Sequence, residues 1–292
     1  MKYFIALVTF FLTTSLYAIN EVTYTTKHQP NRTVEISTVT SADSFVDIIN
    51  ADPKYLESLK AQGQRFPAIV KQIQKTKELI TTKELDSNNN LPFTSIHTSH
   101  ESYLLQNGQK IKIPSMKDNF LESTFYLTQL QDGTTKLNKI SSNKLSPKEK
   151  KLLFQVFSNI SKKNPLSSRV FKIGESFTDK TPITMPLGSI NLNLIQNTKF
   201  TLREIKNNLA FFDIKATFEI NVNMKEKVQK LNMSFNGFGE GEIIYNMIQK
   251  IETKNNFLMN FEANLQIQEL YTMKMKSVVK MDVTQKIQPT KR

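Results

Sequence analysis

The sequence predicts an α+β fold with a large, curved, mostly antiparallel sheet, a meander that is partly closed and barrel-like, with about three helices packed against it. Apolar and polar residues alternate with a period of two along several long segments of the C-terminal third. A period near 3.6 is confined to three short segments, at residues 53–62, 67–82 and 147–162. Alternation indicates strands, and a 3.6-residue period indicates helices. Strands that are apolar on one side must bury that side, either by curving round or by packing against helices.

The N-terminus has the features of a secretory signal. Lys2 precedes the ten-residue apolar run YFIALVTFFL, and a short polar stretch then leads to the small residue Ala18. Such segments are removed on export, and spanning a bilayer needs about 20 apolar residues. We therefore expect residues 1–18 to be a signal peptide, the mature chain to begin near Ile19 without a transmembrane segment, and the protein to be periplasmic or secreted.

Composition limits the classes of chemistry. The chain of 292 residues has no Cys and a formal net charge of +13. The lack of Cys excludes a disulfide framework, a thiol nucleophile and a Cys-ligated metal. The positive charge could attract an anionic envelope surface. Because Lys and Asn are abundant throughout the chain, we favour the simpler interpretation of a solvated basic surface, and we expect no nucleic-acid partner.

Residues 19–165 are expected to form a region of strands and helices that is continuous with the C-terminal meander. Residues 21–49 are rich in β-formers and contain a turn at Gln29-Pro30-Asn31. Helix 53–62 is predicted from an Asp-Pro start and a Gly stop. Helix 67–82 is predicted from four apolar residues on roughly one face: Ile69, Val70, Ile73 and Ile80.

Strands are expected again between Phe93 and Ile140, with hairpin turns at Asn107-Gly108 and Asp132-Gly133. The third helix begins with a capping box at Ser146 and Glu149. Its apolar stripe is Leu152, Leu153, Val156, Phe157 and Ile160. The region from 136 to 163 holds eight Lys and one acid. This concentration is typical of a solvated helix face, and a contact patch for an anionic partner is the alternative.

Residues 166–292 are expected to form about five long antiparallel strands, with turns at Asn207-Asn208 and Lys254-Asn255-Asn256. Residues 210–224 show the clearest alternation. Side chains alternate between the two faces of a strand, so one set should be buried and the other exposed. The buried set is Phe212, Ile214, Phe218 and Ile220, and the exposed set is Asp213, Lys215 and Glu219.

Methionine is concentrated in this meander, with eight of the ten Met from residue 185 onward. Met is flexible and polarisable and suits surfaces that adapt to apolar partners. With neighbouring Phe residues it could line a site for a lipid or another amphipathic ligand, whereas a filled core is the alternative. The candidate lining residues are Phe200, Phe212, Phe218, Met224, Met233, Phe257, Met259, Phe261, Met273 and Met275.

Motifs for chemistry are few. His97 and His100 could share a metal only if that segment were helical, and the Ser and Thr around them favour strand or loop. The spacing of Met273 and Met275 follows from strand alternation without Cu(I). The GFGEG run at 237–241 opens no helix, so it indicates close strand approach rather than a dinucleotide loop. We expect no catalytic, metal-binding or cofactor-binding residue, although an enzyme remains an alternative.

Four short segments follow one another in the C-terminal half: NP…FKIGESF…MPLG over 164–188, FTLREI over 200–205, residues 210–220, and GFGEG followed by Tyr245. In this order they resemble a family of uncharacterised secreted bacterial β-rich proteins, which carry a P…KxGdsW-like block before their final strands. Phe177 stands where the pattern prefers Trp. The resemblance implies export and a β-rich fold but no chemistry. By architecture alone the chain is also similar to periplasmic lipoprotein carriers, and function does not follow from fold.

Three functions are therefore open. The first is an exported protein that binds or carries an apolar or amphipathic ligand such as a lipid. The second is a structural or interaction protein of the envelope with a filled core and a basic outer face. The third is a hydrolase. An apolar pocket lined by the Met and Phe residues favours the first over the second, and a convergent His, Ser and acid cluster favours the third.

Overall fold

The structure is a computed structural model that describes residues 20–25, 28–63, 65–106, 109–113, 118, 120–160, 166, 168–187, 190–220, 231–267 and 271–289. Two helices lie in these ranges, α2 (Pro53–Ala61) and α3 (Pro147–Ile160). The strands are β1 (Glu21–Tyr24), β2 (Thr33–Ile49), β3 (Ala68–Thr82), β4 (Leu91–Gln106), β5 (Gln109–Lys112), β6 (Thr124–Gln129), β7 (Thr135–Ser141), β8 (Arg169–Lys172), β9 (Ser176–Leu187), β10 (Ile190–Lys206), β11 (Leu209–Ile220), β12 (Leu231–Asn246), β13 (Ile251–Ile267) and β14 (Tyr271–Gln288).

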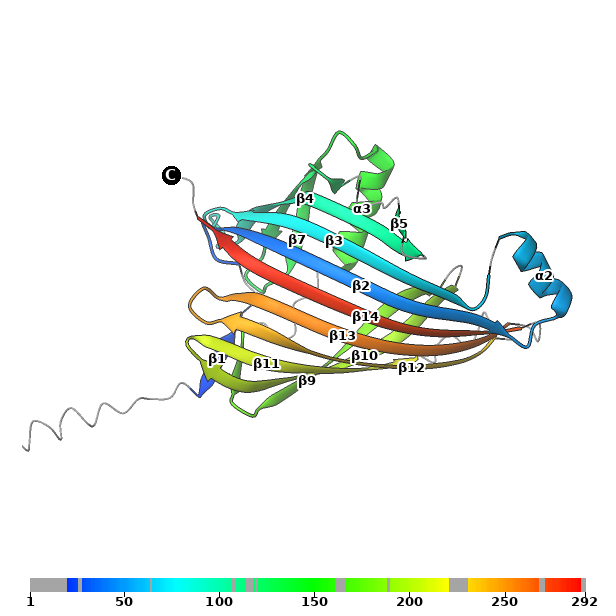
Figure 1. The fold of residues 1–292 in the computed structure, drawn as a ribbon. Coiled ribbons are helices and arrows are strands. Elements are labelled where there is room, and N and C mark those ends of the chain that lie inside the picture. Colours follow the sequence, from blue (N-terminus) through cyan, green and yellow to red (C-terminus); the bar gives the residue numbers. More distant parts are fainter. Residues whose placement is uncertain are drawn as a thin grey trace, which may run out of the picture.

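Twelve strands form one antiparallel sheet in the order β7-β6-β4-β3-β2-β14-β13-β12-β11-β10-β9, with β5 added beside β4 (Figure 1). The last strand, β14, pairs with β2 from Thr272–Ile49 to Gln288–Thr33. The N-terminal and C-terminal regions therefore share one sheet. In the described ranges the sheet ends at β7 and at β9, so it is open, and the expected barrel-like closure is not seen. β1 and β8 form a separate two-stranded sheet.

The sheet has an inner and an outer face. We call the face that carries Phe212 and Phe218 inner, and its register continues across the sheet through the opposed residues Phe261, Ser277 and Ser44. Residues opposite each other on paired strands point to the same face. In Figure 1 the long strands β3, β2, β14 and β13 lie toward the viewer, while β7, β10 and α3 lie behind them.

Both edge strands carry residues that discourage pairing with another chain. β9 contains Pro182 and Pro186, which lack the backbone N–H that pairing uses, and β7 contains Lys136 and Lys139. Proline and lysine are the usual protection of exposed sheet edges.

The helix expected over 67–82 is wrong, because this segment is strand β3. It pairs with β2 along one side and with β4 along the other. Its inner positions are mostly polar, among them Gln72, Gln74 and Thr76, so apolar alternation is absent and the scattered Ile residues imitate a helical face. The hydrogen-bond ladders with β2 and β4, together with the many β-branched residues, stabilise this segment as a strand. The described ranges therefore hold two helices instead of about three.

The other two helices are confirmed. Asp52 caps α2 by accepting a hydrogen bond from the Lys54 N–H at 2.7 Å. At the start of α3 the Glu149 N–H donates to Ser146 Oγ at 3.3 Å, and the Ser146 N–H donates to Glu149 Oε2 at 2.8 Å. This reciprocal pair is the capping box that the sequence predicted. Of the expected stripe, Leu153 packs against the core, whereas Leu152 is exposed.

Some turns differ from expectation. Asn207 and Asn208 both have positive φ, as a tight hairpin turn requires, and Gly133 also lies in a turn. The turn expected at Lys254-Asn255-Asn256 is wrong, since these residues lie inside β13, and the chain turns at 247–250. β1 pairs with β8 rather than with β2. Asn107-Gly108 and the expected signal peptide lie outside the described residues.

Two apolar clusters pack on the inner face. The larger one joins β10–β13 to the small β1–β8 sheet, with Tyr24 lying edge-to-face on Phe212 at 5.4 Å between ring centres. The smaller one joins the β3–β7 end of the sheet to Leu145, which lies just before α3, and to Leu153 of α3. The expected alternation of β11 is confirmed, because Phe212, Ile214 and Phe218 are buried while Lys215 and Glu219 are exposed and Asp213 is half-buried. The side chain of Ile220 lies outside the described part.

Tyr24 anchors β1 to the main sheet. Its hydroxyl donates to the Glu252 carboxylate, and Asn255 Nδ2 donates to the second oxygen of that carboxylate at 3.2 Å. The Tyr24 ring also lies on Tyr245 at 4.7 Å. Burial, followed by the nearby negative charge of Glu252, raises the pKa of Tyr24 well above 10.0.

We expect this contact to make stability fall in alkali. A group whose pKa is raised on folding contributes stability that is complete below its unfolded pKa, near 10 for Tyr, and lost as pH rises through the folded value. Tyr24→Phe should lose about 1.5–3 kcal/mol at pH 7, the usual value of a hydrogen bond to a charged group, and should show a shallower decline above pH 10. Denaturant unfolding at pH 7 to 11 measures both effects. Tyr126→Phe, at an exposed position of β6, is the control, and equal pH profiles for all three proteins would contradict the role of Tyr24.

Candidate functional site

The structure gathers most of the predicted lining residues on the inner face. Phe212, Phe218, Phe257 and Phe261 are buried in the larger cluster, and Phe200 and Met259 pack against it. Met273 and Met275 lie opposite Leu265 and Ala263 and are half-buried. Met233 is also opposite Leu265 in the register, but its side chain lies outside the described part, as does all of Met224. The phenylalanines therefore form a packed floor, and the methionines stand beside it.

An apolar surface, interrupted on β14 by Ser277, remains half-exposed next to this floor. We call it the methionine surface and define it by Met259, Met273, Met275, Val279 and Met281. All five are half-buried, and the register places them on the inner face of β13 and β14. The inner positions of β2 beside them, such as Val46 and Ile48, are half-buried as well. The inner face therefore changes from mostly buried over β11–β13 to half-buried over β14 and β2.

A polar band adjoins the methionine surface on β2, β3 and β4. The cross-strand row Phe257–Met281–Thr40–Gln74–Ser102 shows the change from apolar to polar along a single line. The next row is Val283–Thr38–Thr76–His100, which is apolar on β14 and polar on the other three strands. The band consists of Thr38, Thr40, Gln72, Gln74, Thr76, Glu78, Ser95, His97, His100 and Ser102.

The far side of this band is hydrogen-bonded. His100 Nδ1 lies 2.8 Å from Asp118 Oδ1, its Nε2 lies 3.3 Å from Gln74 Nε2, and its side chain is 1% exposed. Ser95 donates to the Glu78 carboxylate. These bonds fix the band at β4, while Gln72 is exposed and Thr40 is half-buried. The polar band is therefore hydrogen-bonded at its buried side and accessible on β2 and β3.

The three histidines of the chain lie on the β3–β7 half of the inner face. The ring of His28 is 5.2 Å from Phe93, and that of His97 is about 6 Å from Phe120 and Phe125. Burial lowers the pKa of His28, and the charge of Glu78 opposes this shift. A strand with one extra residue at Thr98, rather than a helix, brings His97 and His100 to the same face. Among the described residues no group of three or more His, Asp and Glu could hold a metal.

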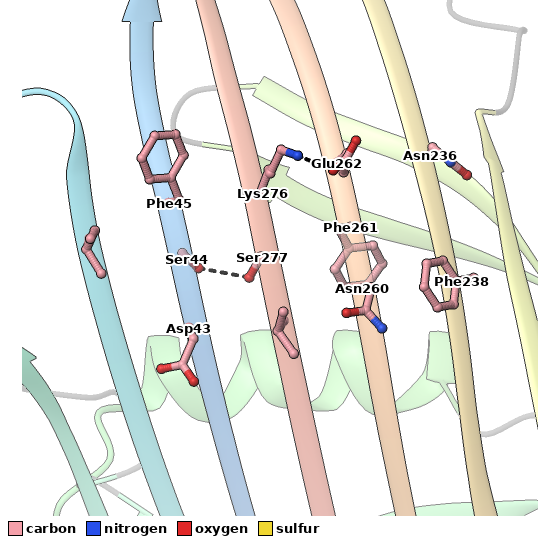
Figure 2. Close-up of a pocket in the computed structure, with 12 residues that line it drawn as sticks. Asp43, Ser44, Phe45, Asn236, Phe238, Asn260, Phe261, Glu262, Lys276 and Ser277 are labelled. Atoms are coloured by element: carbon pink, nitrogen blue, oxygen red, sulfur yellow. Dashed lines mark hydrogen bonds and ion pairs between the residues drawn. The ribbon is translucent and has the colours of Figure 1, made fainter.

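The outer face carries a hollow of about 480 Å³ across β3, β2, β14, β13 and β12 (Figure 2). Three of its apolar side chains are strongly exposed, Ile69 at 76%, Phe238 at 55% and Val278 at 42%. Ion pairs border it, with Lys276 Nζ 2.6 Å from Glu262 and Lys71 Nζ 3.3 Å from Asp43. Charges of both signs thus surround this hollow. No local pattern in the sequence indicates this hollow, because its apolar residues come singly from separate strands.

A smaller hollow of about 300 Å³ lies at the β4–β5 edge. It is lined by His100, Glu101, Ser102, Tyr103, Lys110 and Lys112. Lys110 lies 3.9 Å from both the Tyr103 ring centre and Glu101 Oε2. Lys110 and Lys112 are opposite Leu105 and Tyr103 in the register, which are outer positions of β4.

The GFGEG run serves close packing, as the sequence indicated. Gly237, Gly239 and Gly241 occupy successive inner positions of β12, and the rings of Phe257 and Phe261 lie over them. A Cβ on Gly239 would come within 2.5 Å of Phe257 Cζ, and one on Gly241 within 2.1 Å of the Asn256 carbonyl oxygen. The missing side chains make room for the aromatic floor.

The polar band was missed at the level of sequence, although a signal was present. In residues 71–77 Lys71, Lys75 and Lys77 alternate with the uncharged residues Gln72, Gln74 and Thr76. A period of two in charge also indicates a strand with two different faces, although the apolar residue Ile73 lies on the same face as the lysines. The apolar residues of this segment by themselves favour a helix and do not show the alternation.

Neither described helix is long and apolar enough to cross a membrane. No protein-family model matches the chain, and no curated protein matches it. Among solved structures the chain is similar to the V. cholerae Type IV competence pilus secretin PilQ, determined by cryo-electron microscopy. The two are 11% identical, the alignment covers 88% of this chain and 58% of that chain, and the TM-score is 0.14. A TM-score this low carries no argument, so the resemblance to secreted β-rich proteins stays a prediction.

Proposed function

We propose that this protein is exported and binds or carries an apolar or amphipathic ligand, such as a lipid, on the inner face of its sheet. The observation that carries this proposal is the methionine surface, whose five side chains are half-buried beside a floor of buried phenylalanines. An apolar surface that the fold leaves accessible gains free energy when a ligand covers it, by about 25 cal/mol per Å². Flexible Met side chains adapt to ligands of varied shape.

The proposal is tested by binding of an apolar fluorescent probe, N-phenyl-1-naphthylamine. We expect the wild type to bind it and the double variant Met275→Gln/Met281→Gln to bind about tenfold or more weakly, because polar side chains then line the surface. The variant Met275→Leu/Met281→Leu keeps the surface apolar and should retain binding. Its retention shows that the loss comes from polarity rather than from damage to the fold, which thermal unfolding checks separately.

The second candidate is a structural or interaction protein of the envelope, and the exposed hollow on the outer face favours it. Ile69→Gln, at the most exposed apolar position of that hollow, is the matched control for the methionine variants. Under our proposal it leaves probe binding unchanged. Loss of binding in Ile69→Gln, together with normal binding in the Met→Gln variant, would place the apolar site on the outer face and contradict the proposal.

A further inference from the structure

We propose that the ligand is an amphipathic lipid with an uncharged, hydroxyl-bearing or amide-bearing headgroup, which the polar band on β2 and β3 binds while the methionine surface holds the acyl chain. This inference rests on the proposed function and names the ligand class of the same site. The two surfaces meet within one row of the inner face, where Met281 lies directly opposite Thr40 and Thr40 directly opposite Gln74. A ligand lying across the row contacts both surfaces.

Charge decides against an anionic headgroup. The inner positions of β2, β3, β14 and the described part of β4 carry no Lys or Arg. The lysines of β3 and β14 all point to the outer face, namely Lys71, Lys75, Lys77, Lys274, Lys276, Lys280 and Lys286. A carboxylate or phosphate that leaves water must be paired with an opposite charge as well as hydrogen-bonded to offset its desolvation. The acidic inner residue Glu78, bonded to Ser95, disfavours an anion further.

The polar band suits a headgroup that both donates and accepts hydrogen bonds. Thr hydroxyls and Gln amides do both, and they match hydroxyl and amide groups of a ligand. On β2, next to β14, Thr38 and Thr40 are half-buried, and on β3 Thr76 is half-buried and Gln72 is exposed, so each offers accessible surface to a headgroup. Gln74 lies within 3.3 Å of His100, which Asp118 holds in turn. This buried network positions the band.

Two ligands with the same acyl chain test the inference, 1-monolauroylglycerol and laurate, each used below its critical micelle concentration at pH 7.5. Laurate is ionised at this pH, since carboxyl pKa values lie near 4. Displacement of N-phenyl-1-naphthylamine measures both affinities. We expect the glycerol ester to bind about tenfold more tightly than laurate. The variant Thr40→Val/Gln72→Leu should lose about tenfold in affinity for the ester, the usual effect of one or two hydrogen bonds, and change little for laurate.

Thr284→Val, at an exposed outer position of β14, is the control and should leave both affinities unchanged. If the probe binds and both ligands displace it equally, and the polar-band variant has no effect, the headgroup inference fails while the proposed function stands. A preference for laurate also overturns the inference and points to Lys110 and Lys112 at the β4–β5 hollow. If neither the probe nor either ligand binds the wild type, the proposed function itself fails.

Discussion

Phe218→Ala is expected to destabilise the protein by about 3–5 kcal/mol, the usual cost of emptying a buried Phe site. Phe218 is 5% exposed, and its ring lies edge-to-face on Phe261 at 5.1 Å between centres. Strands β11 and β13 hold the surrounding side chains in long ladders, so the cavity cannot close easily. Chemical unfolding of the ligand-free protein at neutral pH measures the loss.

Phe238→Ala is the matched control, because it makes the same change on the outer face at a residue that is 55% exposed. It should alter stability by about 0.5 kcal/mol or less. The same pair also separates the two candidate functions. Under the carrier proposal, lipid raises the melting temperature of the wild type, since binding to the folded state stabilises it. If Phe218→Ala loses much stability, and lipid changes the melting temperature of neither the wild type nor Phe218→Ala, the result would count against the carrier and favour the filled core.

Gly241→Ala is expected to destabilise the protein by about 3 kcal/mol, the upper part of the range for overpacking. The added Cβ would lie 2.1 Å from the Asn256 carbonyl oxygen and 3.0 Å from the Phe257 Cα, both backbone atoms of the paired strand. Relief of this clash requires β12 and β13 to separate, which breaks hydrogen bonds of their ladder. Unfolding by denaturant, monitored by circular dichroism, reports the change.

Glu240→Ala, one residue earlier on β12, points to the outer face and is exposed, so it should remain near wild-type stability. Gly237→Ala should cost less than Gly241→Ala, because the three atoms nearest its added Cβ belong to the side chains of Phe261, Phe218 and Phe235, whose rings can shift. Equal stability for Gly241→Ala and wild type would show that the strands are not in close contact at this point.

Where local chemistry is strong, the sequence by itself determined the structure. The alternation of residues 210–220 determined strand β11 and its buried face, because a strand points successive side chains to opposite sides. The Asp-Pro start of α2 and the capping box of α3 determined two helices. The GFGEG run determined that β12 is closely packed against its neighbours at these glycines. Each of these depends on residues near one another in the chain.

The partners of these strands were decided only by the tertiary structure. β3 has too few inner apolar residues to indicate a strand, and it becomes one because β2 and β4 bind its backbone on both sides. The pairing of β2 with β14 and of β1 with β8 joins residues more than a hundred positions apart. No local pattern specifies such pairings.

The candidate site depends on the same long-range pairing. Thr40 lies beside Met281, and Gln74 beside Thr40, only because β2 stands between β14 and β3. The sequence could indicate that Met273 and Met275 share a face, but it could not show that the adjoining strands present Thr and Gln side chains to that face. The division of the inner face into a methionine surface and a polar band follows from strand order, which the whole sheet determines by burying its apolar rows together.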